Sequence, residues 1–143
     1  MIELKARLST GEHILARVLQ NKVSDLKVRI AKFFEDYGQA EFLSEKDLRD
    51  FTKEELNDEI NSIVAKNLIV KKEVVSRKDA DKFLDLSRLN FEIKEVRVIS
   101  IGNFDCRACG DPHVDNTSEI GVFEIFKVKK VGAGRYRYQF RVK

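Results

Sequence analysis

The chain is organised around the stretch Cys106-Arg-Ala-Cys109-Gly-Asp-Pro-His113-Val-Asp-Asn-Thr-Ser-Glu-Ile-Gly121. This stretch holds both cysteines of the sequence, one of its two histidines and its only proline. Cys109 and His113 offer a soft and a borderline metal donor, and one short turn-rich loop can bring both side chains to a single ion. Because a metal site needs more than two ligands, the rest of the chain must supply the others.

The composition is that of a folded globular protein. With 143 residues, 43% hydrophobic and 36% charged, the sequence predicts one domain over residues 1–143 with a real hydrophobic core. The net charge of +3 permits an anionic partner without requiring one. No apolar run is long enough to span a membrane and no signal-peptide pattern opens the chain, so we expect a cytoplasmic protein. There the two cysteines are expected as thiols or ligands, not as a structural disulfide.

Local patterns predict an α+β fold, with helices packed on a largely antiparallel sheet. Ser9 and Glu12 have the spacing of a capping box, which predicts a helix over about residues 10–22 with His13 in its exposed first turn. Alternation, a second capping box and turn residues indicate the other elements. They are strands over residues 26–34 and 39–43, a helix from Thr52 to near Asn67, an extended segment over 68–76, a short helix over 77–85, a strand over 91–101, and a hairpin over 120–130 and 135–143.

His13 is the only other histidine in the chain. Together with Cys109 and His113 it would give three donors and leave a fourth tetrahedral position for water or substrate, which is the pattern of a catalytic zinc site. A histidine near a helix start is more often an ordinary surface or core residue. The residues by themselves leave both interpretations open.

The motifs resemble those of the free-standing alanyl-tRNA editing proteins, whose domain also occurs in alanyl- and threonyl-tRNA synthetases. That family carries His-x-x-x-His followed by Leu-Leu, and later Cys-Gly-Gly-Thr-His-Val followed by Thr-Gly-Glu-Ile-Gly. This sequence has His13-Ile-Leu, then Cys109-Gly-Asp-Pro-His113-Val and Asn116-Thr-Ser-Glu-Ile-Gly121. The resemblance covers residues 8–143 and implies the editing-domain fold.

The first motif can be aligned in two registers. If His13 matched the first family histidine, Arg17 would replace the second. The apolar pair directly after His13 instead matches the Leu-Leu pair after the family's second histidine, so we prefer the register in which Ser9 replaces the first.

The resemblance implies a zinc site that keeps three of the family's four ligands: His13, Cys109 and His113. Asp111 and Thr117 are candidates to line the pocket. Three possibilities stay open for the position that Ser9 leaves: Cys106, which has zinc-knuckle spacing to Cys109, a water molecule, or a site without a stable metal. A redox role for the cysteine pair is not favoured, because no helix is expected to begin after Cys106.

The activity implied by the resemblance is trans-editing, the hydrolysis of the ester that joins a wrong amino acid to the terminal ribose of tRNA. The implied substrates are serine or glycine on the tRNA for alanine. Pro112 stands where alanyl-type motifs have threonine and threonyl-type domains have proline, so seryl-tRNA for threonine is an alternative. A tRNA-binding accessory module that lost catalysis and a structural zinc domain are further alternatives. The sequence does not indicate an oligomeric state.

Basic residues of the last two strands are candidates for contacts with phosphates of the tRNA acceptor stem. The alternative is a solvated strand face whose charges protect the sheet. The residues are Arg135, Arg137, Arg141, Lys127 and Lys129.

Overall fold

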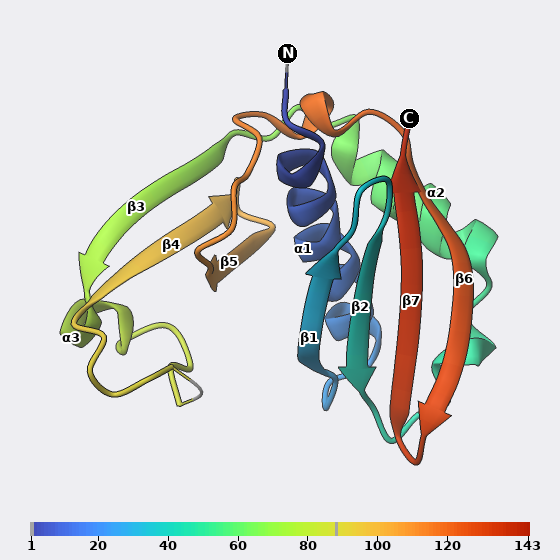
Figure 1. Cartoon of the computed structure of the whole chain (residues 1–143), viewed down its shortest axis with the longest axis horizontal. Helices are drawn as coiled ribbons and strands as arrows, with labels where there is room; N and C mark the ends of the chain where they lie inside the picture. The colour runs from blue at the N-terminus through green and yellow to red at the C-terminus, as the bar shows by residue number, and fades with distance from the viewer. Residues whose placement is uncertain (1, 88) are drawn as a thin grey trace.

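The computed structural model describes residues 2–87 and 89–143, which form two antiparallel sheets and three α-helices (Figure 1). The predicted α+β class is confirmed. No helix of the described residues is long and apolar enough to cross a membrane. The helices are α1 (Leu4–Lys22), α2 (Lys53–Val64) and α3 (Arg77–Ala80), and the strands are β1 (Lys27–Phe33), β2 (Gly38–Leu43), β3 (Val70–Ser76), β4 (Glu95–Ile101), β5 (Asp105–Ala108), β6 (Phe123–Gly132) and β7 (Arg135–Val142).

The first sheet has the strand order β1-β2-β7-β6. Along β7 the side chains of Tyr136, Tyr138 and Phe140 are buried, while Arg137 and Gln139 between them are only partly buried. This alternation gives the last strand one buried face and one face toward solvent. The buried face packs against α1 and α2, which lie behind this sheet in Figure 1.

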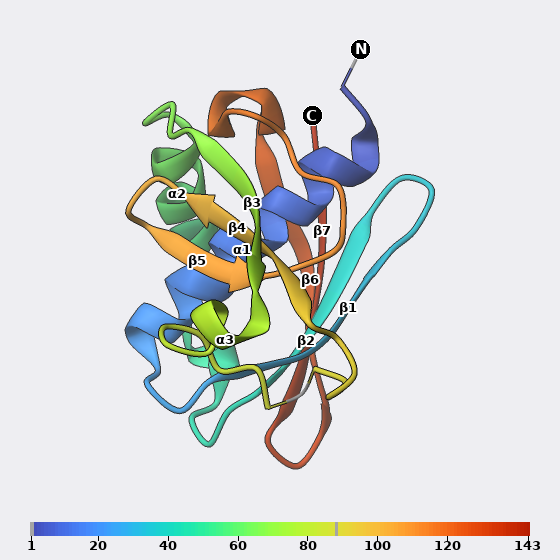
Figure 2. The ribbon, with the colours of Figure 1, turned by 90° about the vertical axis from the view of Figure 1, so that its left-hand side faces the viewer.

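The second sheet has the order β3-β4-β5, so the single sheet expected from the sequence is in fact two. Its central strand β4 is buried on both faces: Val96 and Val98 pack in a small cluster with Ala80 and Leu86, whereas Ile99 and its neighbour Ile101 belong to the main core. Helix α1 runs between the two sheets (Figures 1 and 2). It is therefore covered on more than one side, which an ordinary surface helix is not.

The capping box predicted from Ser9 and Glu12 is wrong. Helix α1 begins at Leu4, so both residues lie inside it, and its N-cap residue Glu3 makes no side-chain cap. Ser9 instead donates to the carbonyl oxygen of Pro112, and Glu12 accepts from the guanidinium of Arg107. The side chains of Ser9 and Glu12 therefore bond residues far along the chain and do not cap the helix, as their local spacing would suggest.

The segment between β3 and β4 is also less regular than predicted. The helix expected over residues 77–85 ends at Ala80, and the strand expected from Phe91 begins at Glu95. Among the described residues of this segment, the guanidinium of Arg77 donates to four carbonyl oxygens. They belong to Leu86, Leu89, Asn90 and Ile93.

Helix α2 has the capping box predicted at Thr52 and Glu55. It also closes the outer edge of β6 with two asparagines. Asn61 accepts from the amide of Phe123 at 2.9 Å and donates to its carbonyl oxygen at 2.8 Å. Asn57 accepts from the amide of Ile125 at 2.8 Å. The two side chains thus supply the partners that a neighbouring strand would give.

Replacing Asn61 by alanine is expected to destabilise the protein by about 1–3 kcal/mol, because the part-buried amide of Phe123 loses its acceptor. The free energy of unfolding in urea measures this loss. Ser62→Ala, at the exposed neighbouring position, is the control and should change stability by less than about 0.5 kcal/mol. Equal effects of the two substitutions would contradict the role given to Asn61.

Candidate metal centre

His13, Cys109 and His113 converge although the chain between the first two is nearly 100 residues long. One ligand atom from each lies within 4.8 Å of the others. His113 Nε2 is 3.4 Å from Cys109 Sγ, and the two imidazole rings meet edge to face with centroids 4.5 Å apart. The histidines are buried, with exposed fractions of 2% and 6%. The structure thus brings together the three residues that the sequence singled out, from α1 and from the loop after β5.

The chemistry of these three groups fits a divalent cation. Burial lowers the pKa of His13 well below its ordinary value and that of His113 to about 4, so both imidazoles are neutral at neutral pH and keep a lone pair. Burial raises the pKa of the Cys109 thiol. A bound cation would supply the positive charge that its thiolate needs. Two imidazoles and one thiolate are a donor set suited to zinc.

The sequence reasoning assigned no role to Asp105, which lies behind His13. Its Oδ2 is 3.7 Å from His13 Nδ1, and both atoms are buried without a hydrogen-bond partner in the described residues. Burial raises the pKa of Asp105, and the guanidinium of Arg17, which donates to Oδ1 at 2.8 Å, opposes that rise. A carboxylate at this place can orient His13, as carboxylates commonly do for histidine ligands of metals.

A second ion pair joins α1 to β5. Arg107 donates to both carboxylate oxygens of Glu12, at 2.7 and 3.0 Å. The Glu12 side chain is 1% exposed, and burial raises its pKa although Arg107 opposes the rise. Arg107 and Asp105 alternate with Cys106 along β5, so both face α1. The pair fixes the strand against the helix next to His13.

Ser9 lies on α1 one helical turn before His13. Its Oγ is 3.3 Å from both ring nitrogens of His113. Cys106 is not part of the three-residue group. It faces the other side of β5, where it packs on the small second cluster and accepts from Ser100 at 3.6 Å. Of the possible fourth ligands, Cys106 is therefore not brought to the site.

The two residues expected to line the pocket have different surroundings. Asp111 Oδ2 accepts from Cys109 Sγ at 3.7 Å, and its other oxygen is 3.6 Å from Lys5 Nζ. Thr117 is fully buried elsewhere, where its hydroxyl donates to the carbonyl of Val64 and accepts from the amide of Leu68. Thr117 thus joins the end of α2 to the start of β3, and the structure corrects its expected place in the pocket.

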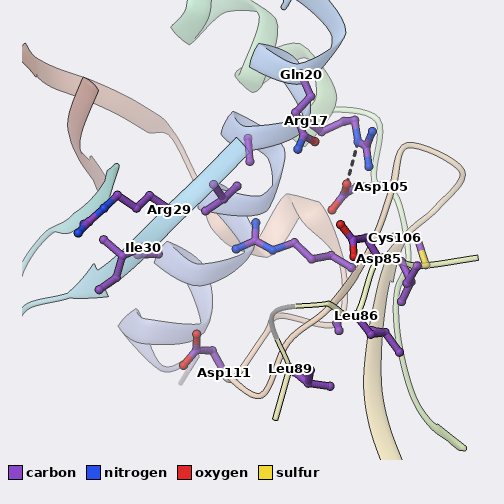
Figure 3. Close-up of a pocket in the computed structure, with 16 residues that line it drawn as sticks. Arg17, Gln20, Arg29, Ile30, Asp85, Leu86, Leu89, Asp105, Cys106 and Asp111 are labelled. Carbon is purple, nitrogen blue, oxygen red and sulfur yellow. Dashed lines mark hydrogen bonds and ion pairs between the residues drawn. The ribbon is translucent and has the colours of Figure 1, made fainter. Parts of the chain in front are cut away.

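A cavity of about 480 Å³ lies near the three donors, because Asp105 and Asp111, which neighbour His13 and Cys109, line it. It lies between β1 and β5, with α1 along one side and residues 84–86 and Leu89 along another (Figure 3). The three donors themselves do not line the cavity. Figure 3 shows Arg17 with its bond to Asp105 at one wall, while the Arg29 side chain points away from the cavity.

The candidate RNA-binding residues share the solvent face of the first sheet, opposite the helices, and three of them are paired with carboxylates. Arg137 donates to Glu41 at 2.9 Å and Arg141 to Glu124 at 2.7 Å, and Arg135 lies 3.7 Å from Glu41. The remaining two, Lys127 and Lys129, are exposed.

Arg107→Ala is expected to cost about 3–5 kcal/mol, because it leaves the buried charge of Glu12 uncompensated. The pKa of Glu12 is already raised in the folded protein, and this loss of Arg107 raises it further. A carboxyl whose folded pKa is raised favours folding at acid pH, where it is protonated, and this contribution is lost as pH rises through the folded pKa. Unfolding measured at several pH values should therefore show a smaller penalty at acid pH.

The double variant Glu12→Gln/Arg107→Met is the matched control. Because it removes both charges, it should recover most of the stability lost in Arg107→Ala and show none of its added pH dependence. A penalty for Arg107→Ala that is equal at all pH values would contradict the assignment.

The comparisons with known proteins agree with this geometry. Residues 96–137 match the family described as the threonyl and alanyl tRNA synthetase second additional domain. The chain is 30% identical over 135 residues to the alanyl-tRNA editing protein AlaX-L of Pyrococcus horikoshii, and the match covers 94% of this chain and 33% of that protein. It is 32% identical over 141 residues to AlaX-M of Methanosarcina barkeri, with 94% and 56% covered.

The alanine–tRNA ligase of Streptococcus pneumoniae is 54% identical over 44 residues, which are 31% of this chain and 5% of the ligase. The chain thus spans between a third and three fifths of the length of the two editing proteins. The long matches include both halves of the candidate metal centre. The resemblance seen in the motifs is confirmed: over most of its length the chain is similar to alanyl-tRNA editing proteins, and a shorter stretch is similar to alanine–tRNA ligases.

Proposed function

We propose that the protein is a zinc-dependent aminoacyl-tRNA deacylase that removes a wrong amino acid from tRNA. The observation that carries the proposal is the convergence of His13, Cys109 and His113 beside a cavity of about 480 Å³. The names of the two editing proteins supply the class of substrate. The volume lies within the range of small-molecule sites, as the terminal nucleoside and a small amino acid would require.

The three donors would hold the zinc ion. With three protein ligands a fourth position remains for water or substrate, and the ion would act there as a Lewis acid on the ester or lower the pKa of a bound water. In this proposal Asp105, whose Oδ2 lies 3.7 Å from His13 Nδ1, would orient the His13 ring when the ion is bound. Asp111, on the cavity wall beside Cys109, can accept a hydrogen bond from the ammonium group of the amino acid.

A cysteine–histidine dyad is the other hydrolytic arrangement that these residues suggest, since His113 Nε2 is 3.4 Å from Cys109 Sγ. Such a dyad needs a thiolate beside an imidazolium. Burial works against both charges, because it raises the pKa of Cys109 and lowers that of His113 to about 4. The neutral pair favours ligation of a cation over nucleophilic attack by sulfur.

The amino acids proposed for removal are serine and glycine attached to the tRNA for alanine. Pocket contacts distinguish side chains that differ by one small group by only about 1–3 kcal/mol, which is why a second, hydrolytic site improves accuracy. Pro112 supports seryl-tRNA for threonine as an alternative substrate. A tRNA-binding module without catalysis is the second candidate function, and the observation that favours it is Ser9 at the position of a family ligand.

The solvent face of the first sheet is proposed to bind the acceptor stem. Around the carboxylate of Glu41 stand Arg29, Arg135 and Arg137, so this cluster carries an excess of positive charge. Exposed Lys127 and Lys129 extend it along β6. A guanidinium group has five N–H donors, so those that share one carboxylate keep further donors that can contact phosphates.

His13→Ala and Cys109→Ala are expected to lower kcat/KM for deacylation about 100-fold or more, because the ion supplies several kcal/mol of transition-state stabilisation. A panel of seryl-, glycyl- and alanyl-tRNAs measures the activity, and elemental analysis measures zinc per chain. Cys106→Ala is the control for the ligand set and should keep its zinc, since Cys106 is not one of the three converging donors. No hydrolysis by folded, zinc-loaded protein on the whole panel would refute the proposed activity.

Arg137→Gln is expected to weaken tRNA binding and to lower the slope of log K against log salt by about one, because one phosphate contact is lost. Glu41→Gln should strengthen binding, since it removes the charge that competes for the same guanidinium groups. Filter binding over a series of salt concentrations measures both. Lys66→Gln, with the same charge change beyond the end of α2, should leave the slope unchanged; an equal fall there would argue against a defined binding face.

A further inference from the structure

The hydroxyl of Thr10 makes three close contacts in the interior. Its Oγ1 donates to the carbonyl oxygen of Ala6 at 2.9 Å, accepts from the backbone amide of Val114 at 3.1 Å, and lies 2.9 Å from His113 Nδ1. Thr10 is fully buried, so no solvent competes for these contacts. The partners come from α1 itself and from the loop that carries the candidate ligand.

The direction of the third hydrogen bond follows from the other two. A hydroxyl has one hydrogen, and a carbonyl oxygen can only accept, so the hydrogen of Thr10 points at Ala6. Toward His113 the hydroxyl is therefore an acceptor, and Nδ1 must carry the hydrogen. A neutral imidazole has a single N–H, so Nε2 keeps its lone pair. Nε2 is the atom that lies 3.4 Å from Cys109 Sγ.

Ser9 does not oppose this arrangement. Its own hydrogen is donated to the carbonyl oxygen of Pro112 at 2.7 Å. Its Oγ is equally far, 3.3 Å, from the two ring nitrogens of His113, so it stands beside the carbon between them. Ser9 thus has no hydrogen to give to Nε2, and because it is equally far from the two ring nitrogens it favours neither tautomer.

We propose that Thr10 is a positioning residue that fixes the tautomer of His113, with hydrogen on Nδ1, and so directs the lone pair of Nε2 toward the metal. The inference rests on the proposed function insofar as the three donors bind a metal, but the tautomer exists in the metal-free protein as well. The contact also holds the ring in one orientation, since Thr10 is anchored to its own helix through Ala6.

The first test is NMR of metal-free protein labelled with ¹⁵N-histidine, at neutral pH. Two-bond ¹H–¹⁵N correlations distinguish the protonated from the unprotonated ring nitrogen, and the variant His13→Gln assigns the signals because the chain has only two histidines. His113 in the unsubstituted protein is expected with hydrogen on Nδ1. Thr10→Val should move it toward the other tautomer, and Thr10→Ser, which restores the hydroxyl, should restore the first.

The second test is metal affinity, measured with Zn²⁺ against a competing chelator and with Co²⁺ by its absorption spectrum. Loss of a group that orients a ligand commonly lowers affinity about 10–100-fold, and we expect this for Thr10→Val but not for Thr10→Ser. Thr10→Val also leaves the amide of Val114 without its acceptor, so unfolding is measured in parallel. Thr117→Val is the matched control: it removes another buried threonine hydroxyl that binds only backbone, and should change neither tautomer nor affinity.

The outcomes separate this inference from the proposed function. If the unsubstituted protein binds neither ion, the metal site fails while the NMR result still decides the role of Thr10. If the ions bind but His113 carries its hydrogen on Nε2, or if Thr10→Val changes neither tautomer nor affinity, the inference is overturned and the metal site stands.

Discussion

The burial of polar side chains on α1 is the constraint on which the rest of the structure depends. Ser9, Thr10, Glu12 and His13 are consecutive but for one glycine, and all four are buried because the helix lies between two sheets. A polar group in such a place costs free energy unless it finds a partner. The partners come from β5 and the loop after it, so the same requirement that stabilises the fold also places Cys109 and His113 beside His13.

The electrostatics of the site result from that burial. The interior disfavours isolated charge, so the imidazoles stay neutral and the acidic groups are paired with arginines from another element. Glu12 and Arg107 form one such pair, and Asp105 and Arg17 the other. The arrangement leaves a set of neutral donors with lone pairs, which suits the cation proposed for this site. The charges at the rim keep the adjoining cavity polar.

Much of the fold could be predicted from the sequence, because alternation and turn residues are local signals. The hairpin of β6 and β7 and the capping box at Thr52 are examples. The three donors could be proposed from motif resemblance. The pair of Arg17 with Asp105 could not, because it joins residues 88 apart and no local pattern links them. The start of α1 was missed for a related reason: Ser9 carries a capping signal that long-range contacts override.

The orientation of the β5 side chains could be predicted in part. Once Asp105 is known to face α1, strict alternation turns Cys106 away from the metal centre, and the zinc-knuckle spacing loses its meaning. The sequence predicted that the preceding strand ends at residue 101 and assigned no strand to residues 105–108. If residues 105–108 are not recognised as a strand, the spacing of Cys106 and Cys109 suggests that both cysteines bind one zinc ion. The place of Thr117 could not be predicted either, because its hydroxyl bonds backbone groups at the end of α2 and before β3, far along the chain.

The asparagines of α2 have a consequence for how the molecule can associate. A sheet normally ends in a row of unpaired amides and carbonyls, which invites another chain to add a strand. Asn57 and Asn61 occupy those groups at Phe123 and Ile125, so the first sheet behaves there as though it had a further strand made of side chains. Beyond them the same edge carries lysines, whose repulsion discourages pairing. At Phe123 and Ile125 the sheet edge therefore offers another chain no free backbone groups to pair with, although the solvent face of the sheet stays uncovered.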